Sequence, residues 1–104
     1  MIKKDLLFIP GYYQIFIINT DQYKLINEIN IQDSGIIFGV CMLNKNMVLT
    51  GDNNKTIKQW KIEGNNLILI SKKERAHDGL ISVLLNLGNG LIASGSYDLS
   101  IKIW

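Results

Sequence analysis

The 104-residue chain is poor in the residues that build several common kinds of site. Its one cysteine, Cys41, excludes an internal disulfide and fits a reducing compartment. One cysteine and one histidine cannot supply the four ligands of a tetrahedral zinc site, so we expect neither a metal nor a cofactor. Nucleic-acid binding gains little support either, because the net charge is only +2 and the basic residues are scattered along the chain.

Long uninterrupted apolar runs are also missing. The apolar segment 6–18 is broken by Pro10, Gly11 and Gln14, and it is shorter than a membrane span. No small-residue cleavage site follows it, as a signal peptide would require. We therefore expect a cytoplasmic or otherwise intracellular protein that does not bind membranes.

What the chain does contain is a series of short apolar runs rich in β-branched and aromatic residues. Asn, Asp, Gly and Lys clusters separate these runs, and no segment reads as a long amphipathic helix, so the pattern predicts an all-β fold. The ten expected strands lie at 4–9, 12–18, 23–31, 36–43, 46–51, 56–62, 67–73, 80–87, 91–96 and 100–104. Two polar connections, 32–35 and 74–79, are expected to link successive sheets.

The sequence repeats itself at an offset of 44 residues. The residues that recur unchanged in segment 79–104 are Gly35, Ile37, Leu43, Gly51, Ile57, Lys58 and Trp60. One offset earlier, Phe16 occupies the tryptophan position. The chain therefore contains two clear copies of one unit and begins with a third, degenerate copy.

The motif residues of this unit resemble those of a known family. Segment 91–104, LIASGSYDLSIKIW, closely resembles the signature of WD repeats, and 47–60, MVLTGDNNKTIKQW, resembles it more loosely. Arg75-Ala76-His77 is similar to the family's Gly-His pair, with alanine in place of the glycine.

The resemblance implies an open partial β-propeller made of antiparallel four-stranded blades. Its expected units are a degenerate partial blade at 1–31, a complete blade at 32–73 and a blade without its last strand at 74–104. Propellers have about four to eight blades, so we expect a fragment or a subunit of a larger assembly. The implied function is a non-catalytic scaffold whose partners are other proteins, possibly including further propeller blades in the same or another chain.

The family also has a hydrogen-bonded tetrad, which falls by position on His77, Ser94, Asp98 and Trp104. An indole N–H only donates, so a buried tryptophan needs an acceptor such as a serine hydroxyl. The hydroxyl can then donate to one imidazole nitrogen, while the aspartate accepts from the other.

In the earlier copy the same positions hold Asp33, Thr50, Asn54 and Trp60. We expect this tetrad to close with exchanged roles: Trp60 donates to Thr50, and both Thr50 and the Asn54 amide donate to the Asp33 carboxylate. On this hypothesis, Asn54→Asp places two carboxylates together and destabilises more than Asp98→Asn.

The family's binding surface consists of inter-sheet loops and of the turns between second and third strands. Here it is expected to include Arg75, Tyr97, Asp78, Asn53 and Asp52. Arg75 and Tyr97 are the expected hot spots, because a planar donor fork and a rigid amphipathic ring contribute most per ordered side chain.

Two other interpretations remain open. His77 and Asp98 with Ser94 or Ser96 could form the catalytic set of a small hydrolase, although the glycines of a nucleophile elbow are missing around Ser96. A non-propeller β-sandwich is the second alternative. Replacement of His77 by alanine separates the enzyme from the scaffold, because only a structural histidine is needed for folding.

Overall fold

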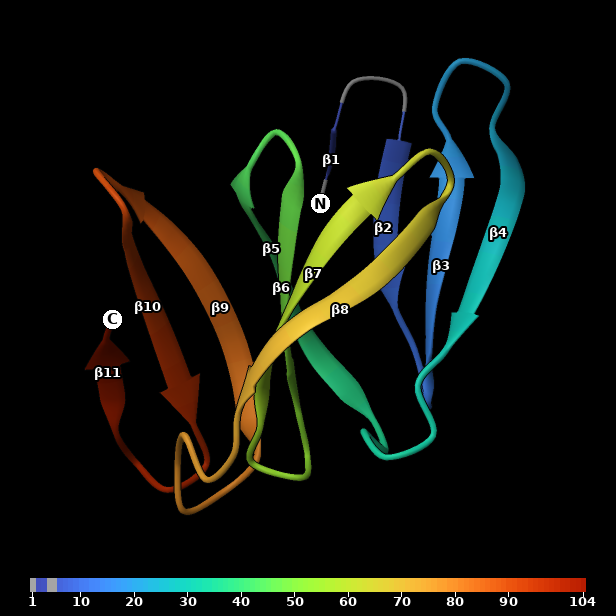
Figure 1. Cartoon of the computed structure of the whole chain (residues 1–104). Coiled ribbons are helices and arrows are strands. Elements are labelled where there is room, and N and C mark those ends of the chain that lie inside the picture. Colours follow the sequence, from blue (N-terminus) through green and yellow to red (C-terminus); the bar gives the residue numbers. More distant parts are fainter. Residues whose placement is uncertain (1, 4–5) are drawn as a thin grey trace.

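The computed structural model describes residues 2–3 and 6–104, with side chains from Leu6 onward. These residues form eleven strands (Figure 1). The strands are β1 (Ile2–Lys3), β2 (Leu6–Pro10), β3 (Gln14–Asn19), β4 (Lys24–Asn30), β5 (Ile37–Asn44), β6 (Met47–Asp52), β7 (Ile57–Glu63), β8 (Asn66–Lys73), β9 (Ile81–Gly88), β10 (Leu91–Ser96) and β11 (Ile101–Ile103). None of the described segments is a helix with the length and apolar character that a membrane span needs.

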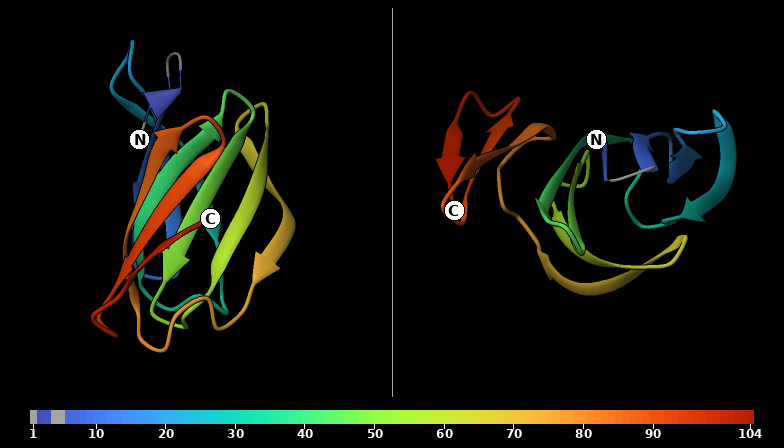
Figure 2. Two further views of the ribbon diagram at one scale, coloured as in Figure 1. Left: turned by 90° about the vertical axis from the view of Figure 1, so that its left-hand side faces the viewer. Right: turned by 90° about the horizontal axis from the view of Figure 1, so that it is seen from above.

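The strands pair into three antiparallel sheets, each built from strands that are consecutive in the chain. We call β1–β4 the N-terminal sheet, β5–β8 the central sheet and β9–β11 the C-terminal sheet. Seen from above, the three sheets follow one another along an arc that does not close (Figure 2). The fold is therefore an open partial β-propeller of antiparallel blades, as the sequence predicts.

The N-terminal sheet has one strand more than expected. The two-residue strand β1 pairs Ile2 with Leu7 and Lys3 with Leu6, which gives this sheet four strands where three were predicted. A strand of two residues is too short to show an alternating pattern in the sequence. The expected inter-sheet links are confirmed, because one sheet ends at Asn30 and the next begins at Ile37, and the same happens between Lys73 and Ile81.

Apolar side chains fill both spaces between neighbouring sheets. Successive residues of a strand point to opposite faces, so Val48 packs toward the N-terminal sheet and Leu49 toward the C-terminal sheet. The first cluster contains Phe8, Ile15, Ile17, Ile31, Ile37, Val48, Trp60, Ile62 and Leu67. The second contains Cys41, Leu49, Ile57, Ala76, Ile81, Leu84 and Ile92. The central sheet is thus covered on both faces.

The turns at the two ends of the sheets use left-handed backbone. Gly64, Gly88 and Gly90 take φ values of 58°, 86° and 79°, which glycine adopts without strain. Lys55 and Leu99 hold the same position in the β6–β7 and β10–β11 turns, and their φ values are 64° and 70°. The repeat therefore imposes one strained turn conformation at both places.

Candidate functional site

The C-terminal sheet brings His77, Ser94, Asp98 and Trp104 into one hydrogen-bonded chain. Trp104 Nε1 donates to Ser94 Oγ at 2.8 Å, and Ser94 Oγ lies 2.7 Å from His77 Nε2. His77 Nδ1 lies 3.0 Å from Asp98 Oδ2. Because the indole can only donate, the Ser94 proton points to Nε2, and Nδ1–H remains for the aspartate.

Asp98 is the last group of this hydrogen-bonded chain, and its carboxylate accepts hydrogen bonds from several further donors. The Ser100 hydroxyl donates to Oδ1 at 2.5 Å, and the backbone amides of Ser100 and Asp78 donate to the carboxylate at 2.9 Å each. The Ser100 hydroxyl, the Asp78 amide and His77 together hold the pKa of Asp98 far below its usual value, against the opposing effect of desolvation. Asp98 is therefore ionised in the folded protein at neutral pH.

In the central sheet only the first bond of the expected tetrad is present. Trp60 Nε1 donates to Thr50 Oγ1 at 3.0 Å. The predicted role of the Asp33 carboxylate as acceptor for Thr50 and Asn54 is wrong. It accepts from the Lys58 ammonium at 2.5 Å, and the Asn54 amide donates to the backbone carbonyl of Asp33 instead.

Lys58 explains this difference, and its role was not predicted from the sequence. Its side chain is only 2% exposed, whereas that of Asp33 is 68% exposed. A buried ammonium needs a charged partner more than a hydroxyl does, so Lys58 takes the carboxylate, and it donates to Ser34 Oγ at 2.6 Å as well. Lys58 and Trp60 occupy every second position of β7, so their side chains point to the same, inward face. This spacing in the sequence could have indicated that Lys58 is buried.

Asp52 does not belong to a partner-binding surface, contrary to the prediction. It is fully buried, and its Oδ1 accepts the backbone amides of Asn54 at 2.9 Å and Thr56 at 3.2 Å. Its Oδ2 has no hydrogen-bond partner among the described residues. Burial raises the pKa of Asp52, although the two amides and the nearby Lys58 charge oppose this.

The inter-sheet connections and the turns between second and third strands meet at one end of the sheets, which we call the loop face. It lies at the bottom of Figure 1. The amide of Asn53 donates to the carbonyl of Ile36 at 3.0 Å, and the equivalent amide of Tyr97 donates to Leu80 at 3.1 Å. Each turn is thereby fixed against the connection that precedes it.

A glycine beneath each of these turns permits the close approach. A Cβ on Gly35 would lie 2.1 Å from Asn53 Oδ1, and one on Gly79 would lie 2.8 Å from the backbone nitrogen of Asp98. Gly35 also has a φ of 65°, which favours glycine. These two invariant positions of the repeat therefore position the loop face.

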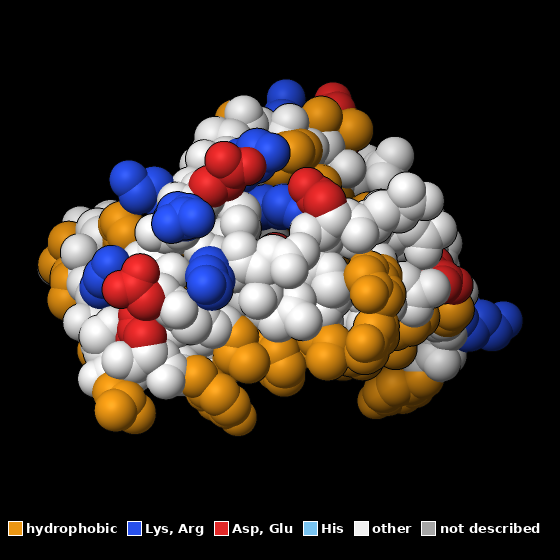
Figure 3. Space-filling model, turned by 90° about the horizontal axis from the view of Figure 1, so that it is seen from below, with side chains coloured by type: hydrophobic (Ala, Val, Ile, Leu, Met, Phe, Trp, Pro, Cys, Tyr) orange, Lys and Arg blue, Asp and Glu red, His pale blue; other side chains and the backbone are white. Residues whose placement is uncertain are grey.

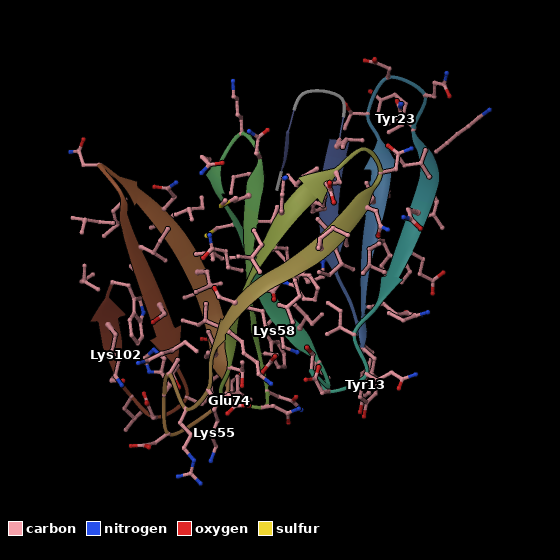
Figure 4. All side chains as sticks on the ribbon, in the orientation of Figure 1. Tyr13, Tyr23, Lys55, Lys58, Glu74 and Lys102 are labelled. Atoms are coloured by element: carbon pink, nitrogen blue, oxygen red, sulfur yellow. The ribbon has the colours of Figure 1, made fainter. Side chains whose placement is uncertain are left out.

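The other four predicted partner-binding residues are exposed on the loop face. Arg75, Asp78 and Asn53 are exposed, and Tyr97 is 71% exposed. Figure 4 places Lys55 and Glu74 at this same end. Seen from below, basic and acidic side chains are intermixed over the face, and hydrophobic side chains follow one edge of it (Figure 3).

A polar hollow of about 580 Å³ opens at this end of the central sheet. Its lining residues are Asp33, Asn54, Thr56, Lys58, Lys72, Glu74 and Arg75. Lys72 is paired with Glu74 at 3.1 Å and Lys58 with Asp33. Among the charged residues of this hollow, Arg75 is the one outside these ion pairs, so its guanidinium is available to an external carboxylate.

The surroundings of Cys41 and Ser94 restrict the reactivity of these two side chains. Burial raises the pKa of the Cys41 thiol to about 11, so it is protonated at neutral pH. Ser94 is fully buried, and its oxygen already accepts the Trp104 indole proton. Along the described residues no three His, Cys, Asp or Glu side chains lie together as a metal ion would need.

Comparison with solved structures identifies the architecture. A chain in the crystal structure of the mitotic checkpoint complex superposes on this one with a TM-score of 0.82 and 15% sequence identity, over 96% of this chain and 32% of that one. This chain spans about a third of the length of that neighbour. At this identity the likeness concerns the fold. No family model matches the sequence, and neither does any curated protein.

Proposed function

We propose that the chain is a WD-repeat propeller segment that acts as a non-catalytic scaffold for protein–protein interaction through its loop face. The observation that carries this proposal is the exposure of Arg75 and Tyr97 on hydrogen-bonded backbone: the amide of Ala76, next to Arg75, donates to the carbonyl of Lys55 at 2.8 Å, and the amide of Tyr97 donates to that of Leu80 at 3.1 Å. Ordered loops lose little conformational entropy on binding, and arginine and aromatic side chains dominate interface energies.

The assignment to WD repeats is supported by the polar chain from Trp104 to Asp98. It occupies the positions that the resemblance assigns to the family's tetrad. The structural neighbour is a chain of the mitotic checkpoint complex, and membership of a complex fits an interaction role.

A hydrolase using Asp98, His77 and Ser94 is disfavoured by burial. The three side chains have the spacing of a catalytic triad, but a nucleophile must reach a substrate carbonyl. Ser94 has no exposed surface, and the Trp104 indole occupies its oxygen. The hydrogen-bonded chain from Trp104 to Asp98 therefore fits a structural role in the sheet better than a catalytic one.

The proposal can be tested by placing a photoreactive phenylalanine analogue at Tyr97 and, as the matched control, at Tyr23. Tyr23 is 86% exposed and lies at the opposite end of the sheets (Figure 4). Discrete protein adducts in a lysate of the source cells are expected from position 97 and not from position 23, and Arg75→Glu in the same chain should remove them. Equal adducts from both positions, or adducts insensitive to Arg75→Glu, contradict the proposal.

A further inference from the structure

The polar hollow at the loop face is enclosed by the central sheet and its two connections. Its seven lining residues come from this sheet, from the connection before it and from the connection after it, and a neighbouring sheet is present on each side. Figure 4 shows two of the lining residues, Lys58 and Glu74, towards the loop face. The volume of about 580 Å³ falls within the roughly 300 to 1,000 Å³ of ligand-binding clefts. The hollow can therefore accept part of another molecule.

The charges of the hollow do not all neutralise one another. Three of its five charged side chains are basic. The buried Lys58 ammonium is paired with Asp33, and Lys72 is paired with Glu74 at the rim. Arg75 forms no ion pair with any residue that the structure describes, and it is exposed. One uncompensated positive charge therefore remains at the hollow, and it belongs to a guanidinium.

The backbone of Arg75 is fixed in an unfavourable conformation. Its φ is 51°, in the left-handed region that a residue with a side chain adopts only at a cost in free energy. The amide of the next residue, Ala76, donates to the carbonyl of Lys55 at 2.8 Å, which holds the connection against the β6–β7 turn. Backbone strain of this kind is concentrated at sites that bind ligands. The conformation of Arg75 thus gives a second, independent indication of a binding site.

We propose that the hollow receives one glutamate or aspartate side chain from an acidic segment of a partner protein, and that Arg75 is its main ligand. This inference rests on the proposed function, because it names the chemistry of the partner that the loop face binds. A guanidinium holds a carboxylate through two parallel hydrogen bonds. The Lys72 ammonium has three N–H donors, so it can donate to the same carboxylate while it remains paired with Glu74.

The other polar groups of the hollow select a peptide carboxylate over a phosphate. The side chains of Asp33 and Glu74 are 68% and 69% exposed, so their charges repel a group with two negative charges more than one with a single charge. The Asn54 amide nitrogen donates to the Asp33 carbonyl, so Asn54 Oδ1 can accept a backbone N–H of the bound segment. One carboxylate and one N–H are the groups that an acidic residue of a peptide presents.

The test is an NMR titration of the 104-residue chain with an acetylated and amidated peptide that has one glutamate between glycines. Saturable shifts of the Arg75 and Asn54 side-chain N–H signals are expected, and the same peptide with glutamine should cause none. Arg75→Gln should weaken binding about tenfold or more, and Arg75→Lys should weaken it less, because lysine keeps the charge without the planar fork. The matched control is Lys24→Gln, which removes an exposed charge beside Tyr23 at the opposite end and should leave binding unchanged. Both positions are exposed, so the dispersed amide spectrum of the fold should persist in every variant.

Two further peptides identify the source of the negative charge. A phosphoserine peptide and a glycine peptide with a free C-terminal carboxylate should both bind more weakly than the glutamate peptide. Three results overturn the inference: equal shifts with the glutamate and glutamine peptides, tighter binding of either further peptide, and equal losses in Arg75→Gln and Lys24→Gln.

The photocrosslinking at Tyr97 separates this inference from the proposed function. Specific adducts from a chain that does not bind the glutamate peptide overturn only the assignment of the hollow. Specific binding of the glutamate peptide without adducts overturns only the proposed function.

Discussion

The central and C-terminal sheets solve the same problem with different residues. In both, a tryptophan donates to a hydroxyl on the second strand, at 3.0 Å for Trp60 on the third strand and 2.8 Å for Trp104 directly after it. Beyond that bond the sheets differ, because His77 continues the chain in one and Lys58 is paired with Asp33 in the other. The indole–hydroxyl pair is the constant part of the unit, and the remaining polar groups adapt to one another.

The lysine of the repeat shows how this adaptation works. Lys102 donates to the backbone carbonyl of Ala76 at 2.8 Å, whereas the equivalent Lys58 reaches Asp33 and Ser34. The central sheet has no histidine to fill this space, and the ammonium and its carboxylate take that place. The residue at the histidine position and the partners of the lysine thus differ together between the two sheets.

The turn carboxylates differ in a related way. In the C-terminal sheet the amide of residue 98 donates to Ser96 and that of Ser100 to Asp98, whereas Asp52 alone accepts both equivalent amides in the central sheet. The turn carboxylate of the central sheet, that of Asp52, thus lies two positions earlier in the repeat than that of Asp98, and it is buried. Its pKa is raised, whereas that of Asp98 is lowered.

The largest expected effect is that of His77→Ala, which should lower the free energy of unfolding by about 3 kcal/mol. The substitution leaves a cavity and removes a partner from both Ser94 and Asp98. Urea denaturation of the wild type and the variant measures it. A variant as stable as the wild type would contradict the structural role of this histidine and revive the enzymatic interpretation.

Asp33→Ala, at the equivalent position of the central sheet, should destabilise by about 2 kcal/mol, because it removes the carboxylate that is hydrogen-bonded to the buried Lys58 ammonium. Lys58→Met should cost less than about 1 kcal/mol, since the largely exposed Asp33 can be solvated by water. Denaturation of both single variants and the double variant gives the order. If Lys58→Met is the more costly change, the interpretation of this ion pair is wrong.

The two turn carboxylates should show pH dependences of opposite sign. The lowered pKa of Asp98 stabilises the fold at pH values above 3.8, the ordinary pKa of an aspartate, and this stabilisation is lost as the pH falls below that value. The raised pKa of Asp52 costs stability as the pH rises above 3.8. Asp98→Asn should therefore destabilise more at about pH 7 than at about pH 3, and Asp52→Asn should destabilise less at about pH 7 than at about pH 3.

Unfolding free energies of both variants at the two pH values check this prediction. The wild type, measured under the same conditions, is the reference for each difference. Parallel pH profiles for Asp98→Asn and Asp52→Asn would show that the environments of the two carboxylates do not differ as described.

The smallest expected effect concerns the shared turn conformation. Leu99→Gly should stabilise by about 0.5 to 1 kcal/mol, because it relieves a positive φ at a position where the side chain is 96% exposed. Lys55→Gly should have an effect of the same sign. Leu99→Ala retains the Cβ and should bring no gain, so a stabilisation by alanine in thermal unfolding would point to a cause other than φ.

Much of the fold could be predicted because the repeat has a fixed length and because its short apolar runs alternate with polar turns. The offset of 44 residues related the sheets to one another, and the polar composition of 32–35 and 74–79 predicted the links between them. Strand β1 escaped prediction because Ile2 and Lys3 give no periodic pattern. The four groups from His77 to Trp104 were predicted from the resemblance to WD repeats, which assigns each of them by its position in the repeat.

The polar groups of the central sheet were predicted less well. Position alone assigned Asp33 the role of the histidine, but the partner of a charged group depends on which other charges are buried nearby. The inward orientation of Lys58 could have been predicted, because Lys58, Trp60 and Ile62 occupy every second position of one strand and therefore share a face. The burial of Asp52 could not, because it depends on the turn amides that its carboxylate caps.

The two tryptophans have different surroundings, so their fluorescence should differ. Trp60 is 6% exposed, whereas Trp104 is 40% exposed, with the ammonium groups of Lys73 and Lys102 at 5.8 and 6.0 Å from its ring centroid. Trp104 should therefore emit at longer wavelength and be quenched first by a small solute such as iodide. The central and the C-terminal sheet thus each have their own fluorescent reporter, so the loss of these two sheets can be followed separately in one unlabelled molecule.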